Sequence, residues 1–224
     1  MTTALVTGAN KGIGLEIVRQ LVDRGLTVYL GARDAERGEK AAADTGARFL
    51  QLDVTDPASI ERAAASLDRL DILINNAGIT GGMMNGPGHA DLASVRDVFN
   101  TNVFGVIAVT DAMLPLLRAS AHGRIVNMSS GVGSLAGMAT SQTPDSLAYV
   151  PSKTALNAVT VLYAKVEPNL RVNAACPGYC ATDLNNHAGH RTAAQGAAIA
   201  VHLGTLDDDG PTGGFFDDNG AIAW

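Results

Sequence analysis

The sequence predicts a single α/β domain over residues 1–224, built on a parallel sheet of about seven strands with helices on both faces. Short apolar runs alternate with helix-like stretches along the whole chain, as expected of strands that are buried on both faces. No linker, repeat or low-complexity block divides the chain. A glycine-rich turn joins the first strand to the first helix, which is typical of folds that bind phosphate groups.

The expected elements follow one another as strand and helix. We expect strands at residues 4–6, 27–31, 48–52, 71–75, 123–128 and 171–175, with a last short strand at 213–216. Helical spacing begins at Ile13, and a polar helix follows the second strand up to residue 44. Further helices are expected at 57–67, 92–119, 147–166 and 192–202. Pro57 suits a first helical turn, with Thr55 or Asp56 as the cap.

The turn after the first strand carries Gly8, Gly12 and Gly14. Glycines let the backbone come close to a ligand, and the unpaired N–H groups at the start of the next helix attract phosphate. An ordinary strand-to-helix turn can also be rich in glycine, so this stretch alone leaves both interpretations open.

Composition argues against several classes of function. The net charge is −6 and the pI about 5.2, so we expect no nucleic-acid partner, because such a partner needs a positive surface. No apolar run approaches the roughly 20 residues of a membrane span, and the first residues lack a signal-peptide pattern. Cys176 and Cys180 are too few for a disulfide framework or a zinc site. We expect a cytoplasmic protein without a metal.

In a sheet of this kind, ligands bind beyond the carboxyl ends of the strands, where the strand order reverses. The residues after the expected strands are small, polar or glycine-bearing, which suits a binding crevice. They lie at 7–14, 31–34, 53–54, 75–78, 128–131 and 177–182.

Several of these stretches resemble motifs of the short-chain dehydrogenase/reductase family. The glycine turn has the spacing Gly-x-x-x-Gly-x-Gly, and further segments match in the family's order at 52–54, 75–78, 102–105, 125–130, 149–153 and 176–178. Each motif alone is a weak signal, but their order at the expected strand ends is hard to obtain by chance. The resemblance covers essentially the whole chain and implies a Rossmann-type doubly wound fold. The glycine turn, Lys11, Arg33 and residues 213–215 are most similar to the carbonyl-reductase branch.

The residues after the second strand bear on the choice of cofactor. A family member that uses NAD would place an acidic side chain there for the ribose 2′-hydroxyl, whereas this chain has Ala32 followed by Arg33. An arginine can hold a 2′-phosphate by charge-assisted hydrogen bonds, and Lys11 adds a second positive charge on the same side. We therefore expect NADPH/NADP+. The alternative is that Arg33 is a surface residue paired with Asp34 or Glu36.

The resemblance implies further cofactor contacts. Asp53 would hydrogen-bond the adenine amino group, although it also suits a capping role in the next turn. Asn75 is as readily a structural residue at a strand end. The complete set expected to bind the cofactor is Gly8, Asn10, Lys11, Gly12, Ile13, Gly14, Arg33, Asp53, Val54, Asn76, Ala77, Gly78, Tyr149, Lys153, Pro177, Gly178 and Thr182.

The chemistry is expected at Tyr149 and Lys153, which are four residues apart and so share one face of a helix. A phenol has an ordinary pKa near ~10, and a nearby ammonium lowers that pKa towards neutrality. The resemblance implies that Tyr149 protonates the substrate oxygen and that Lys153 holds the nicotinamide ribose. It also implies that Ser130, rather than Ser129, hydrogen-bonds the substrate oxygen, and that Asn102 supports a water in a proton relay. A plain surface pair on a helix is the alternative for the tyrosine and the lysine.

Pro151 lies between these two residues and departs from the family pattern. Proline suits only the first turn of a helix, so the helix should begin near Ala148 or be distorted around Tyr149.

The stretch between Ser130 and Tyr149 is short, whereas carbonyl reductases known as monomers carry a long insert there. Without that insert the helices at 92–119 and 147–166 can pack against a second copy, so we expect a homodimer or homotetramer. Residues 183–190 would form a lid over the substrate. Candidate pocket walls, which also fit ordinary packing, are Met83, Met84, Leu135, Met138, Tyr179 and Leu184.

The sequence thus favours an NADPH-dependent oxidoreductase that reversibly reduces a ketone or aldehyde, a small-molecule carbonyl, to an alcohol. One alternative is reduction of a 3-oxoacyl group on a carrier protein, for which the acidic net charge gives little support. The other is a regulator that senses NADPH without turnover; the presence of both Tyr149 and Lys153 argues against it.

Overall fold

The computed structural model describes residues 2–82, 86–138 and 146–224. These residues form one eight-stranded sheet in the order β3-β2-β1-β4-β5-β6-β7-β8. Its strands are β1 (Thr3–Thr7), β2 (Thr27–Ala32), β3 (Arg48–Gln51), β4 (Ile72–Asn75), β5 (Arg124–Met128), β6 (Arg171–Ala175), β7 (Phe215–Asp217) and β8 (Gly220–Ala221). The first seven pair in parallel, as the sequence predicted, and β8 pairs antiparallel with β7. Strand β8 has two residues, which are too few for a sequence pattern to predict it.

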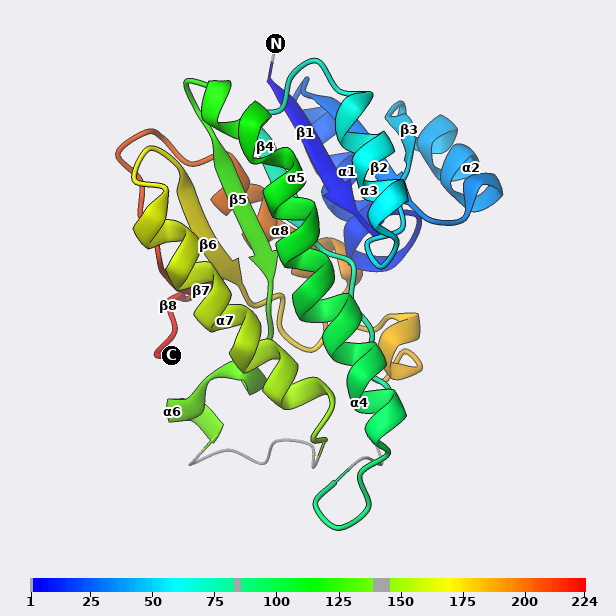
Figure 1. Ribbon diagram of the computed structural model, residues 1–224, viewed down its shortest axis with the longest axis vertical. Coiled ribbons are helices and arrows are strands. Elements are labelled where there is room, and N and C mark those ends of the chain that lie inside the picture. The colour runs from blue at the N-terminus through cyan, green and yellow to red at the C-terminus, as the bar shows by residue number, and fades with distance from the viewer. Residues whose placement is uncertain (1, 83–85, 139–145) are drawn as a thin grey trace.

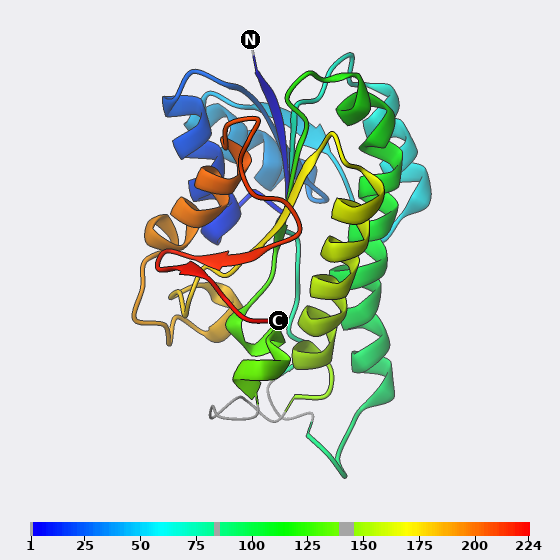
Figure 2. The same ribbon diagram turned by 90° about the vertical axis from the view of Figure 1, so that its left-hand side faces the viewer.

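Helices cover both faces of the sheet (Figures 1 and 2). One face carries α1 (Gly12–Asp23), α2 (Ala35–Thr45) and α8 (Ala193–Gly204). The other carries α3 (Pro57–Ala65), α4 (Leu92–Phe99), α5 (Gly105–Ala119) and α7 (Tyr149–Val166). Short helical turns lie at Gly131–Gly133, at α6 (Leu135–Met138) and at Asp183–Asn185.

The core is divided by the alternation of side chains along each strand. Ala4 and Val6 point into the layer shared with α1 and α8, and Leu5 points into the layer shared with α3 and α5. All three are fully buried. Burial of one such leucine side chain stabilises the fold by about 1.5–3 kcal/mol. The buried side chains on each face of the sheet therefore determine which helices pack on that face.

The helix expected at residues 92–119 is interrupted. A π-helical turn, Asn100–Phe104, joins α4 to α5 and sets Asn102 into the interior. By length and composition the stretch Leu92–Ala119 is apolar enough to cross a membrane, which corrects the expectation that no such stretch exists. Half of its most apolar window is buried, and Val109, Met113 and Leu117 lie in the core. Packing in the core therefore accounts for its apolar character.

Two expected helix starts are confirmed. Asp56 caps α3 by accepting a hydrogen bond from the Ala58 amide at 3.0 Å, with Pro57 in the first turn. Helix α7 begins at Tyr149, so Pro151 lies in its first turn and breaks no helical hydrogen bond.

Candidate active site

The glycine turn is built for close approach of backbone. Gly8 and Gly12 have φ of 62° and 58°, a conformation that side chains rarely adopt. A Cβ atom on Gly8 would lie 2.8 Å from the Ala77 Cα, and one on Gly14 would lie 2.4 Å from the Asn76 amide nitrogen. The turn after β1 therefore packs directly against the chain that leaves β4, and any side chain there would fill the space.

Hydrogen bonds hold these two strand ends together. Asn76 donates its side-chain amide to the carbonyls of Thr7 and Gly8 at 2.9 and 3.2 Å. The backbone amides of Asn76 and Ala77 both donate to the Thr7 hydroxyl at 3.0 Å. The sequence analysis included Thr7 in the stretch 7–14 but did not predict this structural role.

Arg33 follows β2 and is exposed at the carboxyl end of the sheet. Asp34 pairs instead with Arg37 at 3.5 Å and caps α2. Within residues 2–82, 86–138 and 146–224, no ion pair involves Arg33, so the alternative pairing with Asp34 or Glu36 is not found there. Its guanidinium is available to an anion.

Lys11 has a partner that sequence reasoning did not foresee. Its ammonium lies 2.7 Å from an oxygen of Asp183, and both side chains are more than half exposed. This hydrogen bond, together with the lysine's charge, lowers the pKa of Asp183. His187 contacts the other oxygen of Asp183 at 3.0 Å. The polar segment after β6 is thus tied to the glycine turn, and its role as a lid over substrate stays a prediction.

One carboxylate oxygen of Asp53 is hydrogen-bonded to a residue close to it in the sequence. That oxygen accepts hydrogen bonds from the Thr55 amide and hydroxyl at 2.9 and 2.7 Å. This is the turn-forming role left open from the sequence, and contact of Asp53 and Val54 with adenine stays a prediction. Asn75 is structural, because it is buried and donates to Thr110 and Asn127.

Tyr149 lies at the start of α7 and Ser130 directly follows β5, and the Ser130 hydroxyl is close enough to Tyr149 to lower the pKa of the phenol. Ser129 is buried and donates its hydroxyl to Asn157 at 2.6 Å, so it is already engaged. Lys153 lies one turn along α7, with its ammonium 5.6 Å from the centre of the Tyr149 ring. The structure therefore brings together Ser130, Tyr149 and Lys153, while their catalytic roles stay predictions.

The predicted effect of Lys153 on Tyr149 is wrong in this structure. Burial raises the pKa of Tyr149 to about 12 and outweighs the effect of the nearby Ser130 hydroxyl, which lowers that pKa. Burial also lowers the pKa of Lys153 to about 8. The ammonium is directed to the Met128 carbonyl, to which it donates at 2.7 Å. Tyr149 is consequently protonated at neutral pH, the state that a proton donor requires.

Asn102 links two parts of the site. Its side chain accepts a hydrogen bond from the Ile79 amide and donates to the Ile79 carbonyl, both at 2.9 Å. It also donates to the Ser152 hydroxyl at 3.0 Å, and Ser152 donates to the Tyr149 carbonyl at 2.7 Å. Sequence reasoning missed Ser152, although it lies between the tyrosine and the lysine. The expected water relay at Asn102 stays a prediction.

Two glycines bring backbone close to these groups. A Cβ on Gly78 would lie 3.3 Å from the Asn102 side-chain oxygen and 3.6 Å from the Lys153 nitrogen. After β6, Gly178 has a φ of 73° and packs beside Arg191. Cys176, the first residue of the motif at 176–178, is close enough that its charge would raise the pKa of Tyr149.

The candidate pocket walls are partly described. Leu135, Tyr179 and Leu184 are exposed, and Met138 is half-buried. Met83 and Met84 lie outside the described residues. In the described part of the chain, no three His, Cys, Asp or Glu side chains gather as metal ligands.

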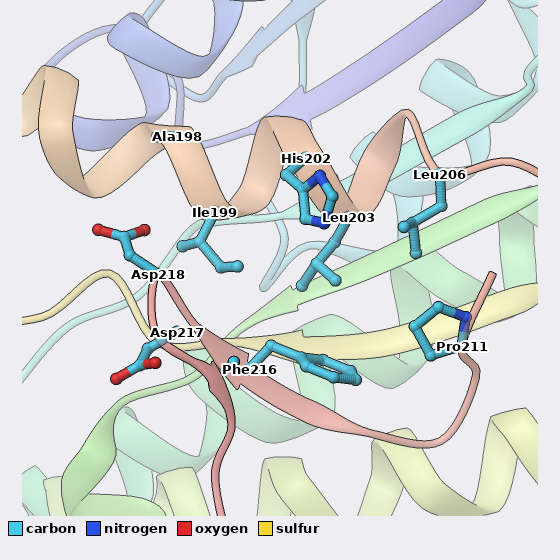
Figure 3. Close-up of a pocket in the computed structure, with 10 residues that line it drawn as sticks. Ala198, Ile199, His202, Leu203, Leu206, Pro211, Phe216, Asp217 and Asp218 are labelled. Atoms are coloured by element: carbon cyan, nitrogen blue, oxygen red, sulfur yellow. The ribbon is translucent and has the colours of Figure 1, made fainter.

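A separate cavity of about 360 Å³ lies between α8 and the β7–β8 hairpin (Figure 3). Ile199, Leu203 and Phe216 form its apolar side, and Asp217 and Asp218 lie at its edge. None of the predicted site residues lines it.

The strand order β3-β2-β1-β4-β5-β6 reverses between β1 and β4, and the glycine turn and Tyr149 lie at the carboxyl ends of these strands. This arrangement defines the dinucleotide-binding class of α/β proteins. A family model described as short chain dehydrogenase matches residues 2–193. The chain belongs to this family, whose members use a nicotinamide cofactor, and it is an oxidoreductase that acts on carbonyl or alcohol groups.

Relatives of known name agree with this assignment. The chain is 33% identical to a (+)-neomenthol dehydrogenase of Capsicum annuum, covering 95% of this chain and 94% of that protein. It is 34% identical to a (−)-isopiperitenone reductase of Mentha piperita, covering 98% and 97%. The crystal structure of an NADPH-bound carbonyl reductase from chicken fatty liver matches with a TM-score of 0.89 at 30% identity, covering 100% and 99% of the two chains. The pepper alignment spans 296 positions, so that relative carries segments absent from this chain of 224 residues.

Proposed function

We propose that this protein reduces a ketone or an aldehyde to an alcohol with NADPH, and catalyses the reverse oxidation. The observation that carries the proposal is the placement of Lys153 one turn along α7 from Tyr149, with its ammonium 5.6 Å from the ring centre, and of Ser130 near the same phenol. A protonated phenol beside a hydroxyl supplies a proton and a hydrogen bond to the same substrate oxygen. The carbonyl-reductase relative, determined with NADPH bound, supports the choice of reaction and cofactor.

The residues present fit a dinucleotide phosphate. Gly8 and Gly14 let the turn pack closely against the chain after β4, where a Cβ atom would collide, and the amides at the start of α1 follow this turn. The exposed guanidinium of Arg33 can hold a 2′-phosphate, and Lys11 lies in the adjacent turn. Lys153 would hold the hydroxyls of the nicotinamide ribose. Bound NADPH would supply a hydride to the carbonyl carbon.

The chain's own residues would handle the oxygen. Tyr149 donates its proton to the carbonyl oxygen as the carbon gains the hydride, which yields an alcohol and the oxidised cofactor. Ser130 donates a hydrogen bond to the same oxygen and stabilises its developing negative charge. The phenolate that remains on Tyr149 then regains a proton from solvent.

A screen of ketones and aldehydes, followed by the loss of NADPH absorbance, tests this proposal. We expect turnover of apolar or aromatic carbonyls with NADPH and weaker turnover with NADH. Tight NADPH binding without turnover across a wide panel would contradict it.

We also propose that two copies pair through α4, α5 and α7. Phe104 in the π-helical turn between α4 and α5, and Leu162 and Val166 on α7, are 58%, 60% and 64% exposed, an unusual share for large apolar side chains. Light scattering after gel filtration should give a dimer or tetramer, and Leu162→Asp should shift it towards monomer. A monomeric wild type would contradict this.

A further inference from the structure

Residues 222–224, here called the brace, lie against residues 134–138, here called the wall segment. Hairpin β7–β8 turns the chain back, and the Ile222 amide donates to the Phe215 carbonyl at 2.7 Å. The brace then runs beside α6, as both views of the fold show (Figures 1 and 2). Segments far apart in the sequence thus meet at one side of the candidate active site.

Three further contacts join the brace to the fold. The Ser134 hydroxyl donates to the Ala223 carbonyl at 2.7 Å, and the Ala136 amide donates to the Trp224 carbonyl at 3.0 Å. The Trp224 ring stacks on Phe215, with ring centres 5.6 Å apart and planes 15° from parallel. Phe215 is fully buried in β7, so the sheet itself anchors the tryptophan.

Ser134 is the centre of this arrangement. It is buried, and its hydroxyl also accepts the Gly137 amide at 2.9 Å, so one oxygen both joins the brace and starts the turn of α6. The Met138 amide donates to the Ser134 carbonyl at 2.9 Å. The brace therefore fixes where α6 stands and how its side chains are presented.

The wall segment is connected closely to the catalytic groups. The turn Gly131–Gly133 joins Ser130 to Ser134, and a Cβ on Gly133 would lie 2.9 Å from the Lys153 backbone. Asn157 of α7 donates to the Gly133 carbonyl at 3.1 Å. Leu135 is nevertheless 62% exposed, which no core role explains. An exposed apolar side chain in the helix that follows the Gly131–Gly133 turn suits contact with the body of a substrate.

We infer that the brace, through Trp224 and Ser134, is a positioning device that sets the substrate range of the enzyme. Held in place, the wall segment presents an apolar surface that binds large ring carbonyls. When the brace is released, the wall segment loses that apolar surface. The proton donor and the cofactor site stay in place, because α7, β1 and β4 hold them. The inference rests on the proposed carbonyl reduction.

Trp224→Ala and Ser134→Ala test this, with Trp224→Phe as the variant that keeps a stacking ring. Loss of an anchoring contact of this size should raise the KM of a bulky ring ketone roughly three- to tenfold. The kcat for a small aldehyde and the Kd of NADPH should not change, and Trp224→Phe should restore the wild-type KM. Asp209→Ala, an exposed change away from the brace, serves as the control.

Hydrogen exchange in the peptide over residues 130–138 gives a second readout. Exchange at Ala136, Gly137 and Met138 should be faster in Trp224→Ala than in wild type or Trp224→Phe. If the wild-type protein reduces no carbonyl, the proposed function is wrong. Hydrogen exchange alone then shows whether the brace holds the wall segment in place. If wild type is active but both alanine variants keep the KM of every carbonyl, or lose kcat equally for all of them, the inference is overturned.

Discussion

The ammonium of Lys11 contacts the carboxylate of Asp183 at 2.7 Å across a sequence separation of 172 residues. The pair joins the glycine turn to the segment after β6. The ion pair therefore lies at the edge of the proposed cofactor site. It engages the Lys11 ammonium, which the sequence analysis assigned to the 2′-phosphate. Binding of NADPH at the proposed site would compete with Asp183 for this ammonium.

Removing the competitor should strengthen NADPH binding. Because exposed ion pairs are worth at most about 1 kcal/mol, Asp183→Asn should lower the Kd of NADPH by roughly two- to fivefold and leave that of NADH nearly unchanged. Titration of cofactor fluorescence measures both. In a double-mutant cycle the gain should vanish in the Lys11→Gln background. A gain that persists there would mean that Lys11 is not the group released.

Arg33 should carry most of the preference for NADPH. Hydrogen bonds to charged groups are worth about 1.5–3 kcal/mol, so Arg33→Ala should weaken NADPH binding by roughly ten- to a hundredfold and NADH binding far less. Arg37→Ala is the matched control, since Arg37 is also exposed nearby but pairs with Asp34. Equal losses for the two cofactors would remove the phosphate role of Arg33.

Tyr149→Phe should abolish turnover and spare NADPH binding. A positioned general acid contributes on the order of a hundredfold or more to the rate, and phenylalanine keeps the ring but has no proton to give. Tyr163→Phe, on the same helix, is the control, because that hydroxyl donates to Asp111 rather than facing Ser130. Full activity of the Tyr149 variant in steady-state assays would refute the assigned acid.

Much of the fold followed from local patterns. Apolar runs such as Ala4–Val6 predicted buried parallel strands, and Pro57 after Asp56 predicted a helix start. The π-helical turn at Asn102 was not foreseen, because its sequence continues the helical pattern and only its packing inside the fold distinguishes it. Helix α6 was missed because four residues carry too little periodicity.

The sequence predicted those site residues whose place follows from the ends of strands and the order of motifs. It did not predict the contacts that depend on tertiary structure. Ser130, Tyr149 and Lys153 come together as motif order implied. The pairing of Lys11 with Asp183 depends on two loops that only the folded sheet brings together. The pKa of Tyr149 depends on how completely the fold removes water, and no spacing along a helix reports that quantity.

Lys153 should make the stability of the free protein depend on pH. Its pKa falls from 10.5 in the unfolded chain to about 8 in the fold, because burial disfavours the charged form. Between these values the unfolded state binds more protons, so stability rises with pH across this window, by on the order of 2–3 kcal/mol. Tyr149 has the opposite sign, since its raised pKa makes stability fall only above pH 10.

Urea unfolding at about pH 7 and about pH 9.5 measures this rise. In Lys153→Met the rise should disappear, because the buried ammonium is gone in both states. Lys165→Met, an exposed lysine on the same helix, should keep the wild-type dependence. If wild type and Lys153→Met show the same change in unfolding free energy between the two pH values, Lys153 is not desolvated as described. Its ammonium then carries no desolvation penalty that a bound ribose could offset.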